Sequence, residues 1–365
     1  MDTVSERIHG DVAPGFEPMR DAYAALDEPG SALAVVIDGE PVVDLWTGEG
    51  WERDTLVHVF STTKPLGALC LLRLVDAGRV GLDDRVTSIW PEYGAAGKAA
   101  TTVRQLLAFQ GGVVAFADPQ PLDLLLDWDR CAAQLAAEAP TWTPGSAHGE
   151  PALVYGHLVG ELVRRIDGRS LGTYFREEVA EPLGLDTHIG ITGPAAARVT
   201  DVEDPDGSWA AALRDGADEL KRRGLENPPG LLDPAVLNGA AWRAAEIPAA
   251  NAHTDARSLA RLYSALARGG ELDGTRLLSE DLLAEAVRVH GDGVDAVFGM
   301  PVQVGLGWRL DGAGVFPHAE FAYGGIGGSL AYGSRERRMG VAFTVRHLAE
   351  FDRVLALDQA LLPLL

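Results

Sequence analysis

Strand patterns occur at both ends of this chain while its middle is patterned as helices, and this arrangement constrains the fold more than any other feature. The strand-like apolar runs are residues 32–37, 42–46, 329–332 and 339–345. Asp38-Gly39, between the first two runs, is a two-residue turn typical of a β-hairpin. Residues 16–26 and 351–365 have the apolar spacing of helices, one ahead of the first hairpin and one after the second.

Between the two hairpins, apolar residues recur at intervals of three and four, the spacing of one helical face. The expected helices are residues 66–76, 103–109, 131–137, 153–166, 171–179 and 255–267. These patterns predict an α+β fold, with one antiparallel sheet from both termini, flanked by helices, and a mostly helical lobe inserted in the middle. The predicted boundaries are 1–60 with 255–365 for the α/β lobe and 61–254 for the helical lobe. The helical lobe includes a long surface excursion at about 201–240.

The charge balance excludes several classes of partner. The chain has 53 acidic and 31 basic residues among 365, a formal charge of −22, which repels phosphate backbones and anionic lipids. We therefore expect neither nucleic acid nor a membrane as a partner. The first thirty residues hold no apolar run of the kind a secretory signal needs, and no window approaches the roughly 20 apolar residues of a membrane span. A cytoplasmic protein is expected.

Metal and cofactor chemistry are not expected either. The nine histidines lack a regular ligand spacing, and the chain has no glycine-rich phosphate loop of the common types. The two cysteines, Cys70 and Cys131, have no CxxC spacing and are interpreted as reduced core residues.

The segment Ser61-Thr62-Thr63-Lys64 is the sharpest chemical signal in the sequence. At the start of a helix, a serine and a lysine three residues apart lie on one face within reach of each other. A serine hydroxyl becomes a good nucleophile only when a neighbouring base takes its proton, and a helix N-terminus favours the charge that develops. The alternative is a serine that only caps the helix, with the lysine in solvent.

Two further segments can complete a site for acyl transfer. Tyr155 begins an amphipathic helix, and a tyrosine oxygen in a cleft can take a proton from serine and return it to a leaving group. The glycine-rich segment 323–329 enters the second hairpin, where backbone N–H groups of a strand edge can bind an oxyanion. The alternatives are a tyrosine ring that only packs and a glycine-rich bulge.

Together, Ser61-Thr62-Thr63-Lys64, Tyr155-Gly156-His157 and Tyr323-Gly324-Gly325, in this order and at these separations, resemble the serine β-lactamase and penicillin-binding-protein superfamily. The branch with the strongest likeness is the class C β-lactamase-like carboxylesterases, the family VIII esterases. The likeness covers roughly residues 15–350.

The resemblance implies a β-lactamase/D,D-peptidase-like fold and assigns roles to individual residues. Ser61 is implied to be the acylated nucleophile, Lys64 and Tyr155 to activate it, and the backbone N–H groups of Ser61 and Ile326 to form an oxyanion hole. The candidate substrate-binding residues are Tyr323, Gly324, Gly325, His157 and Asn251. For His157 the alternative is a local helix contact, and for Asn251 it is a position at the start of a helix that Thr254 or Asp255 can cap.

Two departures from the lactamase pattern favour an esterase. Tyr323 stands where lactamases and peptidases generally place the lysine of Lys-Thr-Gly, and His157 stands where lactamases usually have asparagine. The sequence therefore predicts a serine hydrolase that forms an acyl-enzyme on Ser61 with small or medium esters and uses no cofactor. The alternatives are a biosynthetic transacylase with the same residues, a weak β-lactamase, and a relative that binds or is acylated without turnover.

Overall fold

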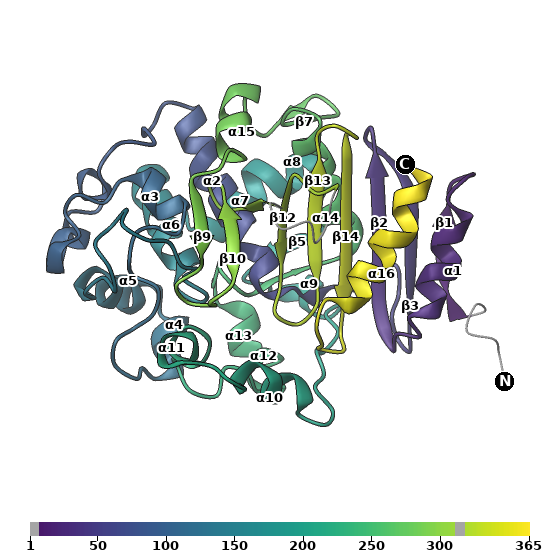
Figure 1. Cartoon of the computed structure of the whole chain (residues 1–365), viewed down its shortest axis with the longest axis horizontal. Coiled ribbons are helices and arrows are strands. Elements are labelled where there is room, and N and C mark those ends of the chain that lie inside the picture. Colours follow the sequence, from purple (N-terminus) through teal and green to yellow (C-terminus); the bar gives the residue numbers. More distant parts are fainter. Residues whose placement is uncertain (1–6, 311–317) are drawn as a thin grey trace.

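A nine-stranded antiparallel sheet forms one side of the protein (Figure 1). The computed structural model describes residues 7–310 and 318–365. The strand order is β1-β3-β2-β14-β13-β12-β11-β10-β9, so the two ends of the chain meet where β2 pairs with β14. The strands are β1 His9–Val12, β2 Gly30–Ile37, β3 Glu40–Gly48, β9 Gly291–Val294, β10 Pro301–Val304, β11 Arg309–Leu310, β12 Phe321–Gly324, β13 Leu330–Ser334 and β14 Met339–Val345. The predicted sheet from both termini is confirmed.

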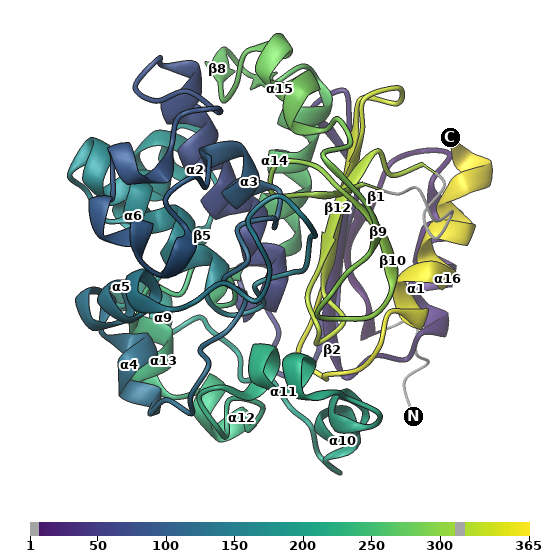
Figure 2. The same ribbon diagram turned by 60° about the vertical axis from the view of Figure 1, so that its left-hand side comes forward.

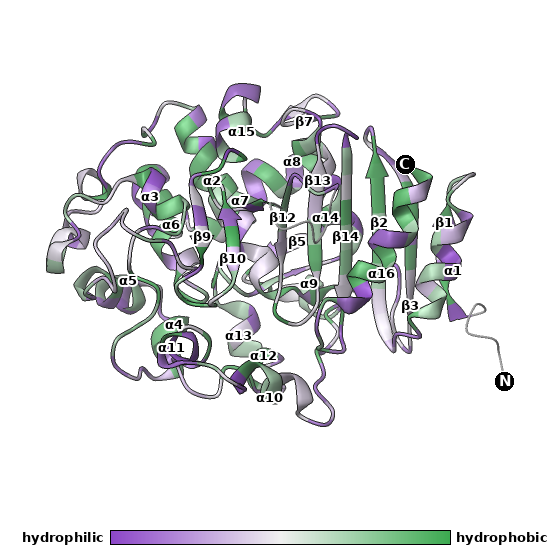
Figure 3. Ribbon diagram, in the orientation of Figure 1, coloured by the Kyte–Doolittle hydropathy of each residue, from purple (hydrophilic) through white to green (hydrophobic). Residues whose placement is uncertain are grey.

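Turn chemistry and burial explain the centre of this sheet. Asp38 and Gly39 both have positive φ, 54° and 89°, as the tight turn between β2 and β3 requires. β2 is apolar from Ala32 to Ile37 because helices cover both of its faces, and Figure 3 shows most of the strand in the hydrophobic colour. Helix α14 (Ala256–Ala267) packs on one face, against β2, β13 and β14.

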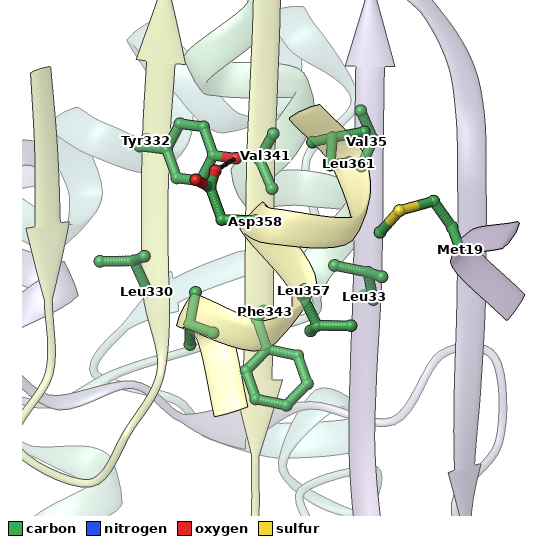
Figure 4. Close-up of a pocket in the computed structure, with 11 residues that line it drawn as sticks. Met19, Leu33, Val35, Leu330, Tyr332, Val341, Phe343, Leu357, Asp358 and Leu361 are labelled. Carbon is green, nitrogen blue, oxygen red and sulfur yellow. Dashed lines mark hydrogen bonds between the residues drawn. The ribbon is translucent and has the colours of Figure 1, made fainter. Parts of the chain in front are cut away.

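Helices α1 (Glu17–Ala25) and α16 (Asp352–Leu361) cover the opposite face of the sheet (Figure 2). They enclose a second apolar core with a narrow void, which Figure 4 shows in close-up. The polar side chains at this void are Tyr332 and Asp358, and the tyrosine hydroxyl donates a hydrogen bond of 2.6 Å to the carboxylate. The void is therefore a feature of the core beneath α16.

The helices of the middle region surround α2 (Lys64–Asp76), which packs against α6 (Tyr155–Asp167) and α7 (Leu171–Phe175). Because α2 is covered on nearly all sides, its sequence is apolar almost throughout rather than amphipathic. The other helices of the region are α3 Val103–Leu107, α4 Leu122–Leu126, α5 Trp128–Ala137, α8 Glu181–Leu183, α9 Gly193–Ala196 and α13 Ala240–Ala244. A small sheet, β4 Val57–His58, β6 Ala252–Thr254 and β5 Thr187–Ile189, lies beside them.

The helices expected in this region are present, with ends that differ by a few residues. Thr102 caps α3 in a reciprocal capping box with Gln105. Cys70 and Cys131 are buried free thiols, as predicted. The division into lobes at 1–60 with 255–365 and at 61–254 stays a prediction.

Residues 201–240, expected as a surface excursion, contain regular elements. They form three short helices, α10 Ser208–Arg214, α11 Glu219–Glu226 and α12 Pro234–Leu237. Their apolar side chains, Trp209, Leu225, Leu231, Leu232 and Leu237, are buried against the body of the protein. The weak periodicity of this segment reflects several short elements packed inward. In the described residues, no helix combines the length and the apolar character that crossing a membrane requires.

Candidate active site

Ser61 lies in a single 3-10 turn, Phe60–Thr63, that continues directly into α2. Phe60 has a φ of 48°, the left-handed region that phenylalanine rarely adopts. Backbone strain of this kind is common at functional sites, where the surrounding structure holds it in place. Ser61 itself is 7% exposed, so its hydroxyl lies at the floor of a narrow opening.

Lys64 is fully buried and its ammonium nitrogen contacts the Ser61 hydroxyl. The Nζ to Oγ distance is 2.8 Å, and Nζ also donates to the carbonyls of Ala152, at 2.8 Å, and Ala249, at 3.0 Å. Its fourth neighbour is a carboxylate oxygen of Glu150, at 3.0 Å. Burial lowers the pKa of Lys64, and the charge of Glu150 opposes that shift. The expected proximity of Ser61 and Lys64 is present.

Close backbone packing brings one of these carbonyls to Lys64. A Cβ atom on Gly156, in the first turn of α6, would lie 2.3 Å from the carbonyl carbon of Pro248. Only glycine lets α6 approach the 248–249 segment so closely. The Ala249 carbonyl is thereby held against the end of the Lys64 side chain.

Glu150 is the residue of this site that sequence reasoning missed. Its side chain is 4% exposed, and its second carboxylate oxygen accepts a hydrogen bond of 2.6 Å from Arg309 of β11. Its own N–H donates to Asp295, at 2.9 Å. Burial would raise the pKa of Glu150, but the charges of Lys64 and Arg309 outweigh burial and hold that pKa at about 2. The signal available in the sequence was the position of Glu150, a charged residue between Gly149 and the apolar run that leads into α6.

Tyr155 is buried and its hydroxyl bonds to a backbone carbonyl. Its hydroxyl donates a hydrogen bond of 3.2 Å to the carbonyl of Leu107, and its ring packs edge-on against Phe109. Burial raises its pKa, and the nearby charge of Glu150 adds to the shift. Among the hydrogen bonds of residues 7–310 and 318–365, none joins Tyr155 to Ser61 or Lys64. Its role as a proton relay stays a prediction.

The glycine-rich end of β12 lies directly against the Ser61 turn. A Cβ atom on Gly325 would lie 2.3 Å from the carbonyl oxygen of Val59 and 2.9 Å from Cβ of Phe60. The backbone N–H of Ile326 has no hydrogen-bond acceptor within the described residues. Trp209 of α10 donates a hydrogen bond of 2.6 Å to the Ile326 carbonyl and so fixes this peptide segment. The arrangement suits the oxyanion-hole role expected for Ile326.

Ser61 and Ile326 line one cavity whose other walls are apolar. Those walls are Phe60, Ala152, Leu153, Leu225, Leu231, Leu232, Leu237, Trp242 and Ala250. Four of these five leucines, all but Leu153, come from the 201–240 segment. An apolar enclosure beside a nucleophile binds hydrocarbon and excludes water.

Tyr323 lies in the site, beneath Lys64 and not in the cavity wall. The Nζ atom of Lys64 is 5.8 Å from the centre of its ring, and the guanidinium of Arg309 is 5.9 Å from it. The hydroxyl is buried and has no hydrogen-bond partner among the described residues. Burial and the charge of Glu150 raise its pKa, whereas Arg309 lowers it. Its neighbour Gly324 faces away, toward the ring of Phe351.

His157 and Asn251 have structural positions in place of the expected substrate contacts. His157 is fully buried on α6, where it packs against Trp128 with ring centres 4.8 Å apart, and burial lowers its pKa to about 4. Asn251 is also fully buried, and its amide bonds only to backbone groups, of Trp242, Ala245 and Ile247, at 2.7 to 3.0 Å. These bonds hold the segment that carries the Ala249 carbonyl.

Asp255 supplies the cap of α14 that the sequence allowed, by accepting a hydrogen bond from the Ser258 N–H. In the part of the chain that the structure describes, no three His, Cys, Asp or Glu side chains are grouped so that they could hold a metal ion.

The sheet, the helical region and the Ser61–Lys64 pair at their junction define the class of folds shared by serine β-lactamases and penicillin-binding proteins. The chain belongs to the family described as Beta-lactamase, which it matches over residues 19–363. It is 35% identical to the esterase/beta-lactamase LipL of Mycobacterium tuberculosis (strain ATCC 25618 / H37Rv), over 97% of this chain and 86% of LipL. The resemblance inferred from the sequence motifs is thereby confirmed.

Two solved structures are similar along almost the whole chain. One is a family VIII carboxylesterase, with a TM-score of 0.90 and 35% identity, covering 98% of this chain and 100% of the other. The second is a penicillin-binding protein homologue from Caulobacter crescentus, with the same TM-score, identity and coverage. The predicted fold class is confirmed.

Proposed function

We propose that this protein is a serine carboxylesterase that forms an acyl-enzyme on Ser61. The observation that carries the proposal is the 2.8 Å contact between Lys64 Nζ and Ser61 Oγ at the floor of an apolar cavity. The printed names of similar proteins, an esterase/beta-lactamase and a family VIII carboxylesterase, support the same chemistry. Cytoplasmic location stays a prediction that cell fractionation would check.

In the proposed acylation, Lys64 in its neutral form takes the proton of Ser61 while the serine oxygen bonds to the ester carbonyl carbon. The electron pair of the carbonyl double bond moves onto its oxygen, which the N–H groups of Ser61 and Ile326 stabilise. When the intermediate collapses, the alcohol oxygen leaves with the proton from Lys64. Water then repeats the sequence on the acyl-enzyme and releases the acid.

The cavity walls indicate the class of ester. Apart from the Ser61 hydroxyl, the lining side chains are apolar, and the position that holds a lysine in most β-lactamases is the buried Tyr323. Among the described residues, no cation therefore lies in the cavity wall to attract a carboxylate-bearing substrate. Uncharged esters with short or medium aliphatic acyl groups are the proposed substrates.

The test compares wild type with Ser61→Ala on p-nitrophenyl acetate and butyrate, with mass spectra of the acid-quenched protein. We expect steady release of nitrophenol and an acyl adduct on Ser61 in wild type, with neither in the variant. Turnover by Ser61→Ala at close to the wild-type rate would refute the proposal. Transfer of the acyl group to an added alcohol or amine in preference to water would favour a transacylase.

A further inference from the structure

The end of the Lys64 side chain has more hydrogen-bond acceptors than protons to donate. An ammonium group carries three protons, yet its nitrogen lies within 3.0 Å of four oxygens: Ser61 Oγ, the carbonyls of Ala152 and Ala249, and Glu150 Oε1. A neutral amine here can direct its lone pair at the Ser61 hydroxyl and keep two donors for the other oxygens. After it takes the serine proton, a positive charge is left in a buried site.

Glu150 is placed to stabilise that charge. Its Oε1 contacts Lys64 at 3.0 Å while its Oε2 is held by Arg309 at 2.6 Å, so the carboxylate cannot rotate away without losing both contacts. Since both oxygens are buried, their interaction with the ammonium is weakly screened by solvent. This relation matches a general feature of activated nucleophiles, in which the base is oriented by a third group.

The groups that face the Lys64–Glu150 pair come from several elements. Arg309 is the second cation. Asp295 is a further carboxylate, bonded to the Glu150 N–H. Burial and the charge of Glu150 raise the pKa of both Tyr155 and Tyr323, so both hydroxyls are neutral at ordinary pH. The groups whose charge governs Lys64 are thus Glu150 and Asp295, which favour the ammonium, and Arg309, which opposes it.

We propose that Glu150 is a positioning residue for the Ser61–Lys64 pair, whose carboxylate aims Lys64 at Ser61 and stabilises the ammonium formed as Lys64 takes the serine proton. The proposal rests on the esterase function proposed above. In the acylation step the O–H bond of Ser61 breaks and an N–H bond forms on Lys64. The serine electron pair forms the new bond to the ester carbon. Glu150 keeps its charge throughout and exchanges no proton.

The test measures how the rate of Ser61 modification by a fluorophosphonate depends on pH, because this stoichiometric reaction needs the activated serine but not turnover. Glu150→Gln keeps the shape and removes the charge. Lys64 then loses the carboxylate that favours its ammonium, so we expect the midpoint of the acid limb to move down by about 1 to 3 pH units. The plateau rate should fall roughly 10- to 100-fold, because a less basic amine is a weaker base.

Arg309→Gln should shift the pH midpoint of Ser61 labelling in the opposite direction. It removes a positive charge near Lys64, so the same midpoint should move to higher pH. A variant that is merely damaged would lose rate in either case without opposite shifts of the midpoint. This second variant also keeps the proposal testable if Glu150→Gln does not fold.

Glu161→Gln is the matched control. Glu161 is equally buried and pairs with Arg164 and Arg165 on α6, but it has no contact with Ser61 or Lys64 among the interactions of the described residues. The pH midpoint of Ser61 labelling in Glu161→Gln should equal that of the wild type. The role of Glu150 is overturned if the midpoint is unchanged in both Glu150→Gln and Arg309→Gln, or if it moves in the same direction in both. In that case, labelling of Ser61 in the wild type would still support the esterase proposal. Absence of labelling in wild type at every pH would refute the esterase proposal itself.

Discussion

The close approach between β12 and the Ser61 turn gives the most direct test of the oxyanion-hole geometry. Gly325 has no side chain, and a Cβ atom there would lie 2.3 Å from the Val59 carbonyl oxygen. Real Cβ atoms essentially never come nearer than 3.0 Å to such an atom, so Gly325→Ala forces the two segments apart by at least about 0.7 Å. An ordinary contact would need about 1 Å. The backbone of Gly325 does not have a positive φ, so the effect comes from this contact alone.

A displacement of this size acts directly on catalysis, because Ile326 follows Gly325. Oxyanion donors act at about 2.7–3.1 Å, and a shift of about 1 Å takes the N–H out of that range. Losing one such donor typically costs about 10²- to 10³-fold in kcat. We therefore expect Gly325→Ala to lower kcat for p-nitrophenyl butyrate by about 10²-fold, with a stability loss of about 1–3 kcal/mol from overpacking.

Gly324→Ala is the matched control, since it adds the same methyl group one residue earlier. Its Cβ would meet the ring of Phe351, 2.7 Å away, on the side that faces away from Ser61. We expect a comparable stability loss by urea unfolding but a kcat within about threefold of wild type. The reasoning is refuted if folded Gly325→Ala keeps more than a third of wild-type kcat, or if Gly324→Ala loses as much activity as Gly325→Ala.

Three further substitutions test other parts of the structure. Asn251→Ala leaves three backbone groups unpaired, two of them buried and one part-buried, and should lower the free energy of unfolding by about 2–4 kcal/mol, measured in urea; a loss below 0.5 kcal/mol would contradict the role assigned to Asn251. His157 has a folded pKa of about 4, below the unfolded value near 6.5, so the unfolded state binds the extra proton first and this residue alone should cost the wild type about 2 kcal/mol between pH 7 and pH 5. His157→Phe should lose about that much less over the same range, and an equal loss in both proteins would exclude this histidine as a cause. Leu237→Phe narrows the apolar cavity and should reduce kcat/KM for butyrate relative to acetate roughly tenfold, whereas an unchanged ratio would place the acyl chain elsewhere.

Local interactions account for the features that the sequence predicted well. Asp38-Gly39 fixes a tight turn because both residues adopt positive φ. The spacing of apolar residues at intervals of three and four predicted the helices, because it places these residues on one face that can be buried. The side chains of Ser61 and Lys64 lie together because about one helical turn separates the two residues.

The sequence alone left open what surrounds that pair. The Tyr155 hydroxyl bonds to the carbonyl of Leu107, and Lys64 is paired with Glu150, which Arg309 holds in place. Likewise, the weak pattern of residues 201–240 concealed leucines that complete the cavity wall.

These features depend on how distant segments pack against each other. Neither the burial of a carboxylate nor the direction of a tyrosine is set by its neighbours in sequence. The sequence by itself therefore determined most of the secondary structure, the family and the proximity of Ser61 and Lys64, because each follows from local pattern and spacing. Only the tertiary structure decided the charge environment of Lys64 and the shape of the cavity, since they arise where Arg309 of β11, Glu150 of the loop before α6 and the 201–240 segment come together near Ser61.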